Sequence, residues 1–288
     1  MLQVARLAPK LLSDATDLVV AFLQSQMHES GGFKNRAGEP DLYYTVFGLE
    51  GLVALRAEVP TESTLAYLRR FGNGDALDLV HLACLARGWA NMPPGSLDEH
   101  CSNRMLERLA AFQEIADGPT RAAGGMRSTI YSCFLTAGAY QDLGSALPNP
   151  SEVLATLDTL QADDGGFSNQ PGAVSGSTPA TAAAVTLTRY LGFTPAPSVA
   201  RWLLSRCHPE GGFRATPTAP IPDLLSTATA LHALVGMHES IESVKEPCLN
   251  FIDSLWTSRG SFYGHWADNA LDCEYTYYGL LALGHLSL

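Results

Sequence analysis

Two carboxylates near the C-terminus have the types and spacing of an acid–base pair. Asp272 and Glu274 are separated only by Cys273, and an apolar run follows them. A carboxylic acid that apolar surroundings and a neighbouring carboxylate keep protonated can donate a proton to a bound molecule. We therefore predict Glu274 as a general acid, with Asp272 beside it. The alternative is that Glu274 is only a polar residue at the rim of a pocket or a charge at a helix start.

Aromatic side chains are concentrated near this segment and near similar segments elsewhere in the chain. Aromatic rings line apolar pockets, and they stabilise cations that lie over their faces. The alternative for about half of them is ordinary core packing, because aromatic residues at helical spacing also fill cores. The set comprises Tyr43, Tyr44, Phe47, Tyr131, Phe134, Tyr275, Tyr277, Tyr278 and Trp266.

Three further polar residues are candidates for substrate binding. His81 either points into the pocket or is a partly buried histidine whose hydrogen bonds are satisfied. Arg127 and Arg214 either bind an anion beside helix N-termini or are solvated loop arginines. Both interpretations remain open for each of the three.

An internal repeat organises the chain that carries these residues. A Gly-Gly-Phe element recurs, and more degenerate copies lie between its clear ones. Six copies in 288 residues give an average period of 48 residues (288/6). The copies are Gly31-Gly32-Phe33, Gly72-Asn73-Gly74, Gly124-Gly125-Met126, Gly165-Gly166-Phe167, Gly211-Gly212-Phe213 and Gly260-Ser261-Phe262.

A second recurring segment of five positions follows each Gly-rich element within the repeat. Its first residue is Asp or Ser, which is typical of a helix N-cap, and an Ala- and Leu-rich run at helical spacing follows. A more polar amphipathic stretch precedes the next Gly-rich element, so the repeating unit is helix, loop, helix. The six segments are 41–45, 78–82, 128–132, 177–181, 223–227 and 272–276.

Six such helical hairpins without polar capping repeats favour a closed ring over an open solenoid. We predict an all-α fold, an (α/α)6 toroid formed as a single domain by residues 1–288, with scarce strands and a cavity open where the inner helices start. The segment 91–103 is predicted to be a loop that acts as a lid or a partner surface. The expected repeats cover about 20–60, 61–100, 105–145, 150–195, 198–238 and 245–288.

Composition excludes several classes of protein. The net charge is −11 and only 3 of the 18 basic residues are Lys, so we expect no binding to nucleic acid or to anionic membranes. No long apolar run predicts a membrane span, and the first twenty residues do not resemble a signal peptide. The six cysteines lack a Cys-x-x-Cys pair and are interpreted as buried free thiols. These features favour a cytoplasmic location.

The repeat resembles that of the protein prenyltransferase β-subunits and terpenoid cyclases, and above all the β-subunit of Rab geranylgeranyltransferase. The resemblance covers about residues 20–288 and implies the α/α toroid. It also implies zinc ligands at three positions, which here are Asp223, Leu225 and Tyr275. Of these three residues only Asp223 is of a type that the family uses to bind zinc, and zinc needs three or four donors. We therefore expect no cofactor, unless Asp223 joins Cys273 and Glu274 in a rewired zinc site; otherwise Asp223 is a helix N-cap.

The resemblance also implies a diphosphate-binding His at a position that is Ser177 here, and Arg214 is the one cation in the loop before the fifth segment. The expected function is to bind an isoprenoid or its diphosphate in an aromatic-lined cavity without zinc-activated thiol transfer, as a prenyl transferase or an isoprenoid cyclase. One alternative is a non-catalytic toroid that binds a lipid or a protein. Another is a type II terpene cyclase, whose Asp-x-Asp-Asp acid would correspond to Glu274. The resemblance also suggests a partner subunit, and a homodimer remains open.

Overall fold

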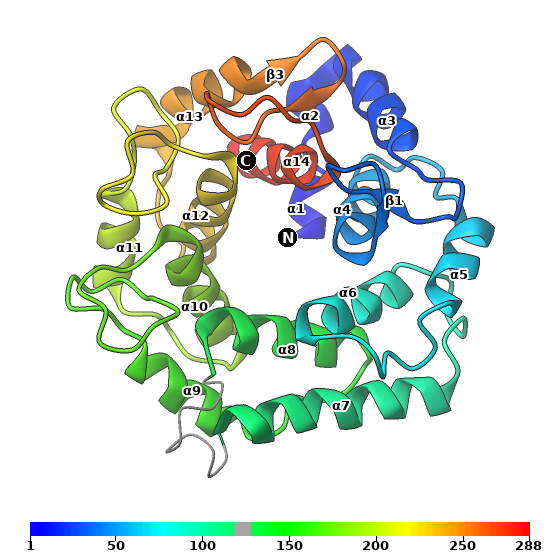
Figure 1. The fold of residues 1–288 in the computed structure, drawn as a ribbon. Helices are drawn as coiled ribbons and strands as arrows, with labels where there is room; N and C mark the ends of the chain where they lie inside the picture. Colours follow the sequence, from blue (N-terminus) through cyan, green and yellow to red (C-terminus); the bar gives the residue numbers. More distant parts are fainter. Residues whose placement is uncertain (118–127) are drawn as a thin grey trace.

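The computed structural model describes residues 1–117 and 128–288, and it forms two concentric rings of helices (Figure 1). This arrangement confirms the predicted all-α toroid. The inner ring comprises α4 (Leu42–Ala54), α6 (Leu79–Ala90), α8 (Ile130–Asp142), α10 (Thr178–Tyr190), α12 (Leu224–Gly236) and α14 (Cys273–Leu286). The outer ring comprises α3 (Thr16–Ser25), α5 (Thr61–Arg69), α7 (Glu99–Asp117), α9 (Pro150–Thr159), α11 (Pro197–Leu204) and α13 (Glu242–Leu255).

The inner ring is closed by contact between its last and first helices. Each inner helix packs on the next one, and α14 packs on both α12 and α4. The inner helices are rich in Ala, Gly, Ser and Thr, and these small residues let neighbouring helices approach closely. The hairpins at the two ends of the sequence are thus neighbours in space.

Local sequence sets the start of every inner helix. Each one begins directly after a side chain that accepts a backbone N–H, which satisfies one of the free donors of the first turn. Five of the six predicted N-caps are confirmed, whereas the third is Thr129 and not Ser128. Thr129 and Ser132 form a reciprocal capping box, which makes Thr129 the better cap. The caps are Asp41, Asp78, Thr129, Ser177, Asp223 and Asp272.

The Gly-Gly-Phe elements join each loop to the neighbouring outer helix. Gly31 has a φ of +93°, and a Cβ there would lie 2.0 Å from the carbonyl oxygen of Ser63. The following Phe33 is fully buried and donates its N–H to Oγ1 of Thr45 at 2.9 Å. The same bond joins Phe213 to Thr227. The repeat therefore keeps Gly for close backbone approach and a hydroxyl for the Phe N–H.

Strands are few in the described part of the chain, as predicted, and each is two residues long. β1 (Phe33–Lys34) pairs antiparallel with β2 (Pro40–Asp41), and β3 (Trp256–Thr257) pairs antiparallel with β4 (Ser261–Phe262). The segment 91–103 is only partly a loop, because α7 already begins at Glu99. Asp98 accepts the N–H of Cys101 at 2.8 Å and so starts that helix early.

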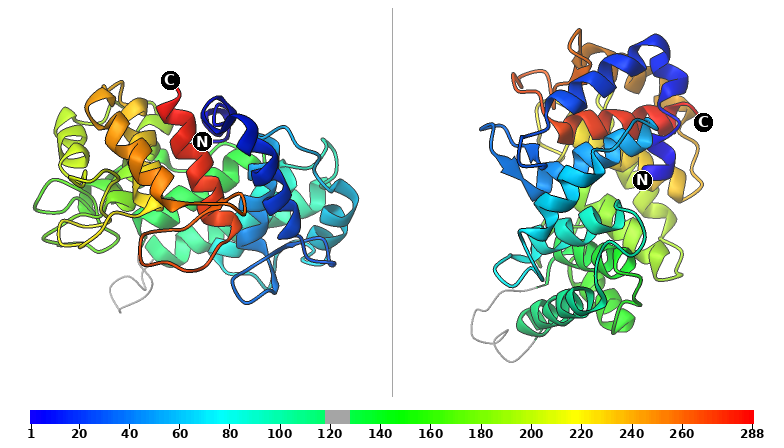
Figure 2. Two further views of the ribbon diagram at one scale, coloured as in Figure 1. Left: turned by 90° about the horizontal axis from the view of Figure 1, so that it is seen from above. Right: turned by 90° about the vertical axis from the view of Figure 1, so that its right-hand side faces the viewer.

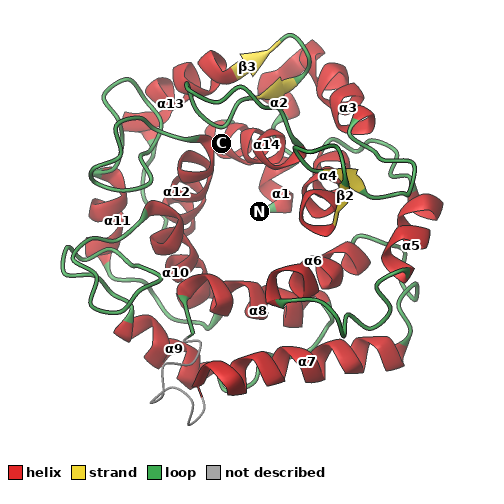
Figure 3. Cartoon of the chain, viewed as in Figure 1, coloured by secondary structure: helices red, strands yellow, loops and turns green. Residues whose placement is uncertain are grey.

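The two ends of the ring are different. We call the end where the inner helices start the mouth and the opposite end the base. The Gly-rich loops gather at the mouth, drawn in green in Figure 3. The short N-terminal helices α1 (Leu2–Ala5) and α2 (Pro9–Leu12), with the 3₁₀ turn η1 (Ser13–Ala15), lie toward the base, where α1 contacts α4 and α14 (Figure 2). No helix in the described part of the chain is long and apolar enough to cross a bilayer.

Candidate functional site

A stripe of incompletely buried residues runs along the inward side of the inner helices. On α10, Pro179, Ala183 and Thr186 keep accessible surface although their neighbours along the helix are buried. The same i, i+4 spacing holds for Tyr43 and Phe47 on α4 and for Glu274 and Tyr278 on α14. Inner helices are covered by inner helices on both sides and by the outer ring behind. Accessible surface at this spacing therefore marks a hollow centre.

The second residue of each inner helix begins this stripe at the mouth. Because every helix starts from a cap in the same register, these six side chains occupy equivalent positions around the ring. Glu274 is the one ionisable carboxyl among them, and two of the others are tyrosines. The six residues are Tyr43, Val80, Tyr131, Pro179, Leu225 and Glu274.

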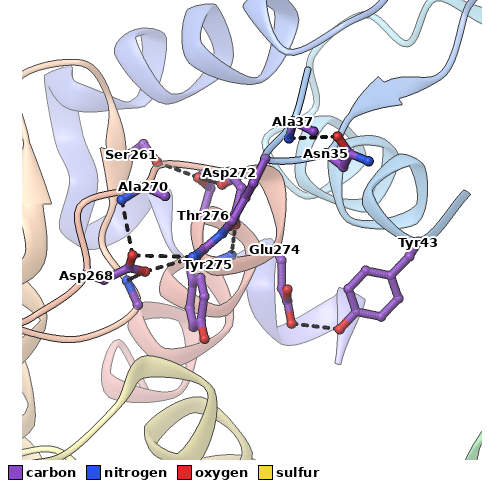
Figure 4. Close-up of polar contacts among 12 residues, drawn as sticks. Asn35, Ala37, Tyr43, Ser261, Asp268, Ala270, Asp272, Glu274, Tyr275 and Thr276 are labelled. Atoms are coloured by element: carbon purple, nitrogen blue, oxygen red, sulfur yellow. Dashed lines mark hydrogen bonds and ion pairs between the residues drawn. The ribbon is translucent and has the colours of Figure 1, made fainter. Parts of the chain in front are cut away.

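Glu274 is bonded to a phenol from the neighbouring helix. The hydroxyl of Tyr43 donates to Oε1 of Glu274 at 2.7 Å (Figure 4). Burial raises the pKa of Glu274, and the charge of Asp272 adds to that, while the Tyr43 hydrogen bond and Arg36 act in the opposite direction. The net effect is a carboxyl that holds its proton at higher pH than an ordinary glutamate.

Asp272 is held beside Glu274 by Arg36 and by the first turn of α14. Its carboxylate is almost fully buried and caps α14 by accepting the N–H of Tyr275 at 2.9 Å. Nε of Arg36 donates to Oδ2 of Asp272 at 2.7 Å, and the same guanidinium contacts Oδ2 of Asp268 at 2.9 Å. The loop between β1 and β2 is thereby fixed to the loop before α14. Two adjacent carboxyls thus have different environments, one paired with Arg and one with a phenol.

Aromatic side chains extend from Glu274 toward the centre of the circle of inner helices. The rings of Tyr43 and Phe47 are 5.0 Å apart at their centroids, and those of Phe47 and Tyr278 are 5.4 Å apart. Burial raises the pKa of Tyr278 well above its ordinary value, and the charge of Glu274 adds to this. On the opposite side, burial and the charges of Cys84 and Glu274 raise the pKa of Tyr131 to about 12. These phenols stay neutral and surround Glu274 from three helices.

Two predicted tyrosines and a predicted histidine lie at the rim of the mouth. Tyr44 stacks edge-on against Tyr43 with centroids 5.6 Å apart. Tyr275 lies beneath Arg36, whose guanidinium carbon is 5.4 Å from the ring centroid. His81 has Nδ1 at 2.8 Å from Oδ1 of its own helix cap, Asp78, so it already has a local partner.

Other predicted residues lie away from Glu274. Tyr277 is 2% exposed and belongs to the core near Glu50. Trp266 packs outside the inner ring, where Nε1 donates to Oγ of Ser254 on α13. Arg214 lies beside Cys207 of the fifth repeat, where its charge helps to lower the pKa of that thiol. Arg127 lies outside the described residues.

The residues of the hypothetical zinc site have other roles in the structure. The carboxylate of Asp223 caps α12 by accepting the N–H of Ser226 at 2.7 Å, and it accepts the Ser226 hydroxyl at the same distance. Cys273 is fully buried, and burial raises the pKa of its thiol. Within residues 1–117 and 128–288, no three His, Cys, Asp or Glu side chains gather closely enough to hold a metal ion.

Sequence reasoning missed Arg36, Asp268 and their link to Asp272. The sequence shows Arg36 and Lys34 as cations of the first Gly-rich loop, but nothing in that loop indicates that Arg36 has a partner 236 residues away. Ring closure alone brings the two loops together.

Comparison with known proteins agrees with this architecture. The chain belongs to the prenyltransferase alpha-alpha toroid domain family, whose model matches residues 6–92 and 194–287. A search of curated protein sequences gave no match.

Several solved structures share the fold at low sequence identity. One is a variant of the type II terpene cyclase MstE from Scytonema in complex with its substrate, geranylgeranyl dihydroxybenzoate (TM-score 0.62, 15% identity, covering 97% of each chain). Another is protein geranylgeranyltransferase-I of Candida albicans complexed with GGPP (TM-score 0.52, 14% identity, covering 99% of this chain and 81% of that one). A third is a glycosidase variant (TM-score 0.59, 11% identity, covering 99% and 96%). The fold thus hosts different chemistries, so function depends on the site.

Proposed function

We propose that this protein binds an isoprenoid in the centre of the helix ring and cyclises it by protonation from Glu274. The observation that carries the proposal is the position of Glu274. It is a carboxyl of raised pKa at the mouth end of the inward stripe, bonded to a phenol and next to an arginine-paired aspartate. A general acid needs this combination of a retained proton and access to substrate.

The proposed reaction starts with transfer of the Glu274 proton to a terminal alkene or epoxide of the isoprenoid. The π electrons of the alkene take up that proton on carbon, or the epoxide oxygen takes it up while one C–O bond breaks to leave a hydroxyl group, and in either case a carbocation forms at the adjacent carbon. An internal alkene attacks this cation, a ring closes, and the last cation loses a proton to water or to a carboxylate. Tyr43, Phe47 and Tyr278 present the electron-rich faces that stabilise such cations as they move inward.

Asp272 supports this step without reacting. Its pairing with Arg36 keeps a negative charge next to Glu274, and a nearby negative charge favours the protonated form of the acid. Asp272 is therefore proposed as a positioning and electrostatic partner. Asp223, which caps another inner helix, is left outside the reaction.

The binding of the isoprenoid chain is supported by the complexes of two structural neighbours, a terpene cyclase with geranylgeranyl dihydroxybenzoate and a geranylgeranyltransferase with GGPP. Tyr44, Tyr131, Tyr275 and Tyr278 would line its path. A diphosphate group is less favoured at this mouth, because Arg36 is already engaged by Asp268 and Asp272. We therefore expect a neutral or weakly charged head group to be preferred over a diphosphate.

Deuterium labelling tests the proposal directly. The protein is incubated in D₂O with geranylgeraniol or geranylgeranyl diphosphate, in which the proton is taken up on a carbon of the terminal alkene, and products are analysed by mass spectrometry. Protonation from Glu274 introduces one deuterium on carbon into a cyclised product. Cyclisation without deuterium would overturn the proposed initiation step.

Matched variants separate catalysis from binding. Glu274→Gln is expected to lower turnover roughly 10²–10⁴-fold while isoprenoid binding is retained, because a general acid contributes about that much. Glu39→Gln, an exposed residue of the Arg36 loop, should leave turnover unchanged. Binding without any product in all forms would instead favour the alternative of a non-catalytic lipid-binding toroid.

A further inference from the structure

The polar side chains at the base of the ring fall into two unlike halves. On α4, α6 and α8, Arg87 is paired with both Glu50 and Asp142, so these charges satisfy one another. The other half consists of α10, α12 and α14, which are consecutive inner helices (Figure 1). There Arg189 forms no ion pair and no side-chain hydrogen bond within residues 1–117 and 128–288. This half therefore holds a cation whose charge the protein does not balance locally.

The guanidinium of Arg189 crosses the inward face of α12. Gly236 stands eleven residues after Leu225, the residue of α12 that begins the inward stripe. Eleven residues are about three turns of helix, so Gly236 faces inward as well. A Cβ on Gly236 would lie 2.3 Å from Nη1 of Arg189, so the guanidinium occupies the space of the missing side chain. An arginine from α10 thereby covers the inner surface of α12 near the base.

His232 presents a ring nitrogen one turn before Gly236. It lies seven residues after Leu225 on the same inward register, and it keeps accessible surface. Its Nδ1 is 3.0 Å from Nε2 of His285, whereas its own Nε2 has no hydrogen-bond partner among the described residues and is not enclosed. Burial, with positive charges that include Arg189, lowers the pKa of His232 to about 3. The ring is therefore neutral near pH 7 and carries one proton.

The contact between the two histidines decides where that proton lies. Nδ1 of His285 is buried and has no hydrogen-bond partner in the described part of the chain. If His232 donated from Nδ1, His285 would have to carry its own proton on this buried nitrogen without an acceptor, and buried N–H groups without acceptors are rare and costly. His285 therefore donates from Nε2, and His232 carries its proton on Nε2. The accessible nitrogen of His232 is thus a donor, like every nitrogen of Arg189.

We propose that this half of the base binds a carboxylate at the oxygen-bearing end of the isoprenoid, through Arg189 and the Nε2–H of His232. The inference rests on the proposed function, in which Glu274 protonates the terminal alkene. In an isoprenoid that alkene and the oxygen-bearing carbon are at opposite ends of the chain, so an alkene at the mouth directs the other end toward the base. Eleven residues separate Glu274 from His285, which is about 16 Å of helix at 1.5 Å per residue. A geranylgeranyl chain is long enough to bridge that distance.

A carboxylate matches these donors better than other end groups do. A guanidinium binds a carboxylate through two parallel hydrogen bonds, and its single negative charge balances that of Arg189. An alcohol accepts hydrogen bonds but leaves the arginine charge unbalanced. A diphosphate carries more negative charge than one arginine neutralises, and the carboxylates of Glu50 and Asp142 lie in the other half of the same base. The expected ligand is therefore an isoprenoid carboxylic acid.

Equilibrium binding of two probes tests the site without turnover. Geranylgeranoic acid and geranylgeraniol share the prenyl chain and differ in the end group. Near neutral pH the unaltered chain should bind the acid about tenfold more tightly than the alcohol, because hydrogen bonds to charged groups contribute about that much. Arg189→Met should abolish this preference by weakening binding of the acid alone. Arg201→Met is the matched control, since Arg201 is an exposed arginine of α11 in the outer ring, and it should keep the preference.

A pair of variants tests the donor on His232. His232→Gln keeps an N–H donor on the side chain and should retain most of the preference for the acid. His232→Phe keeps a ring but removes the donor, so the acid should bind about threefold to tenfold more weakly while the alcohol is less affected. Circular dichroism of each variant verifies that the helical fold is intact. Equal losses in the Gln and Phe variants would overturn the role of His232 as a donor.

The outcomes separate this site from the proposed function. Equal affinity of the unaltered chain for acid and alcohol would overturn the carboxylate site and leave isoprenoid binding intact. A preference that survives Arg189→Met but disappears in Arg214→Met would place the carboxylate at the mouth, which also overturns the assignment. Failure to bind either probe would overturn isoprenoid binding itself and this inference with it.

Discussion

The mouth and the base of the inner ring both hold an arginine between two carboxylates, and at the mouth a further carboxyl, Glu274, lies beside this group without an arginine partner among the described residues. At the base, Arg87 of α6 contacts Oε1 of Glu50 on α4 at 2.8 Å and Oδ2 of Asp142 on α8 at 2.6 Å. At the mouth, Arg36 plays the same part between Asp268 and Asp272. Glu274 stands beside that group with a phenol as its hydrogen-bond partner.

The base also holds two largely buried histidines that are close together. Nδ1 of His232 and Nε2 of His285 are 3.0 Å apart on α12 and α14. Burial lowers the pKa of His232 to about 3 and that of His285 to about 4, so both are neutral near pH 7. The polar groups at the base therefore serve to hold neighbouring inner helices together, and we call the group of Arg87, Glu50 and Asp142 the clamp. The mouth retains a protonatable carboxyl where the centre is open, which is why the proposed chemistry is placed there.

The largest expected effect on stability comes from breaking the clamp at the base. Arg87→Met leaves the carboxylates of Glu50 and Asp142 unpaired and mostly buried, which should lower the free energy of unfolding by roughly 3 kcal/mol. Urea denaturation measures this loss. The triple variant with Glu50→Gln and Asp142→Asn should recover part of it, and a loss that persists unchanged would show that the ion pairs are not its cause.

Breaking the equivalent group at the mouth should cost less stability. Arg36 is 39% exposed, and Asp272 keeps its bond to the Tyr275 N–H, so Arg36→Met should lower the free energy of unfolding by about 1–2 kcal/mol. The same denaturation experiment measures it. If Arg36→Met proved as damaging as Arg87→Met, the two ends would not differ in the way proposed.

Removing the phenol partner should shift the pH dependence of turnover. The Tyr43 hydrogen bond lowers the pKa of Glu274, so Tyr43→Phe raises it further. A general acid acts while protonated, so turnover falls as pH rises through its pKa. The midpoint of that fall should move up by about one pH unit, since one unit corresponds to about 1.4 kcal/mol. An unchanged or lower midpoint would argue that Glu274 is not the titrating acid.

The smallest effect is expected from removing an exposed helix cap at the mouth. The side chain of Asp78 is 65% exposed and caps α6 through the N–H of His81 at 2.9 Å. Asp78→Ala should lower the free energy of unfolding by about 1 kcal/mol or less. The midpoint of the pH profile should not move, because the His81–Asp78 pair is local. A changed profile would indicate that His81 takes part in turnover.

Much of the fold followed from the sequence because its rules are local. An Asp at a helix start accepts N–H groups from two or three residues further along the chain, as Asp41 and Asp272 do. The Gly-rich element likewise recurs once in each helical hairpin. The third cap was placed one residue early because Ser128 and Thr129 are both good caps. Glu274 and its aromatic surroundings were predicted from type and spacing, and their catalytic roles remain predictions.

The sequence by itself determined six helical hairpins, five of their six caps and the register that places Tyr43 and Glu274 at equivalent positions; Tyr131 joins them only because the structure caps α8 at Thr129. Only the tertiary structure decided which side chains meet. The bond between Tyr43 and Glu274 joins residues 231 apart, and that between Arg36 and Asp272 joins residues 236 apart. Helix and cap signals extend over about four residues, whereas these contacts exist because the last hairpin packs against the first. Closure of the ring is thus what turns two ordinary helix starts into one candidate site.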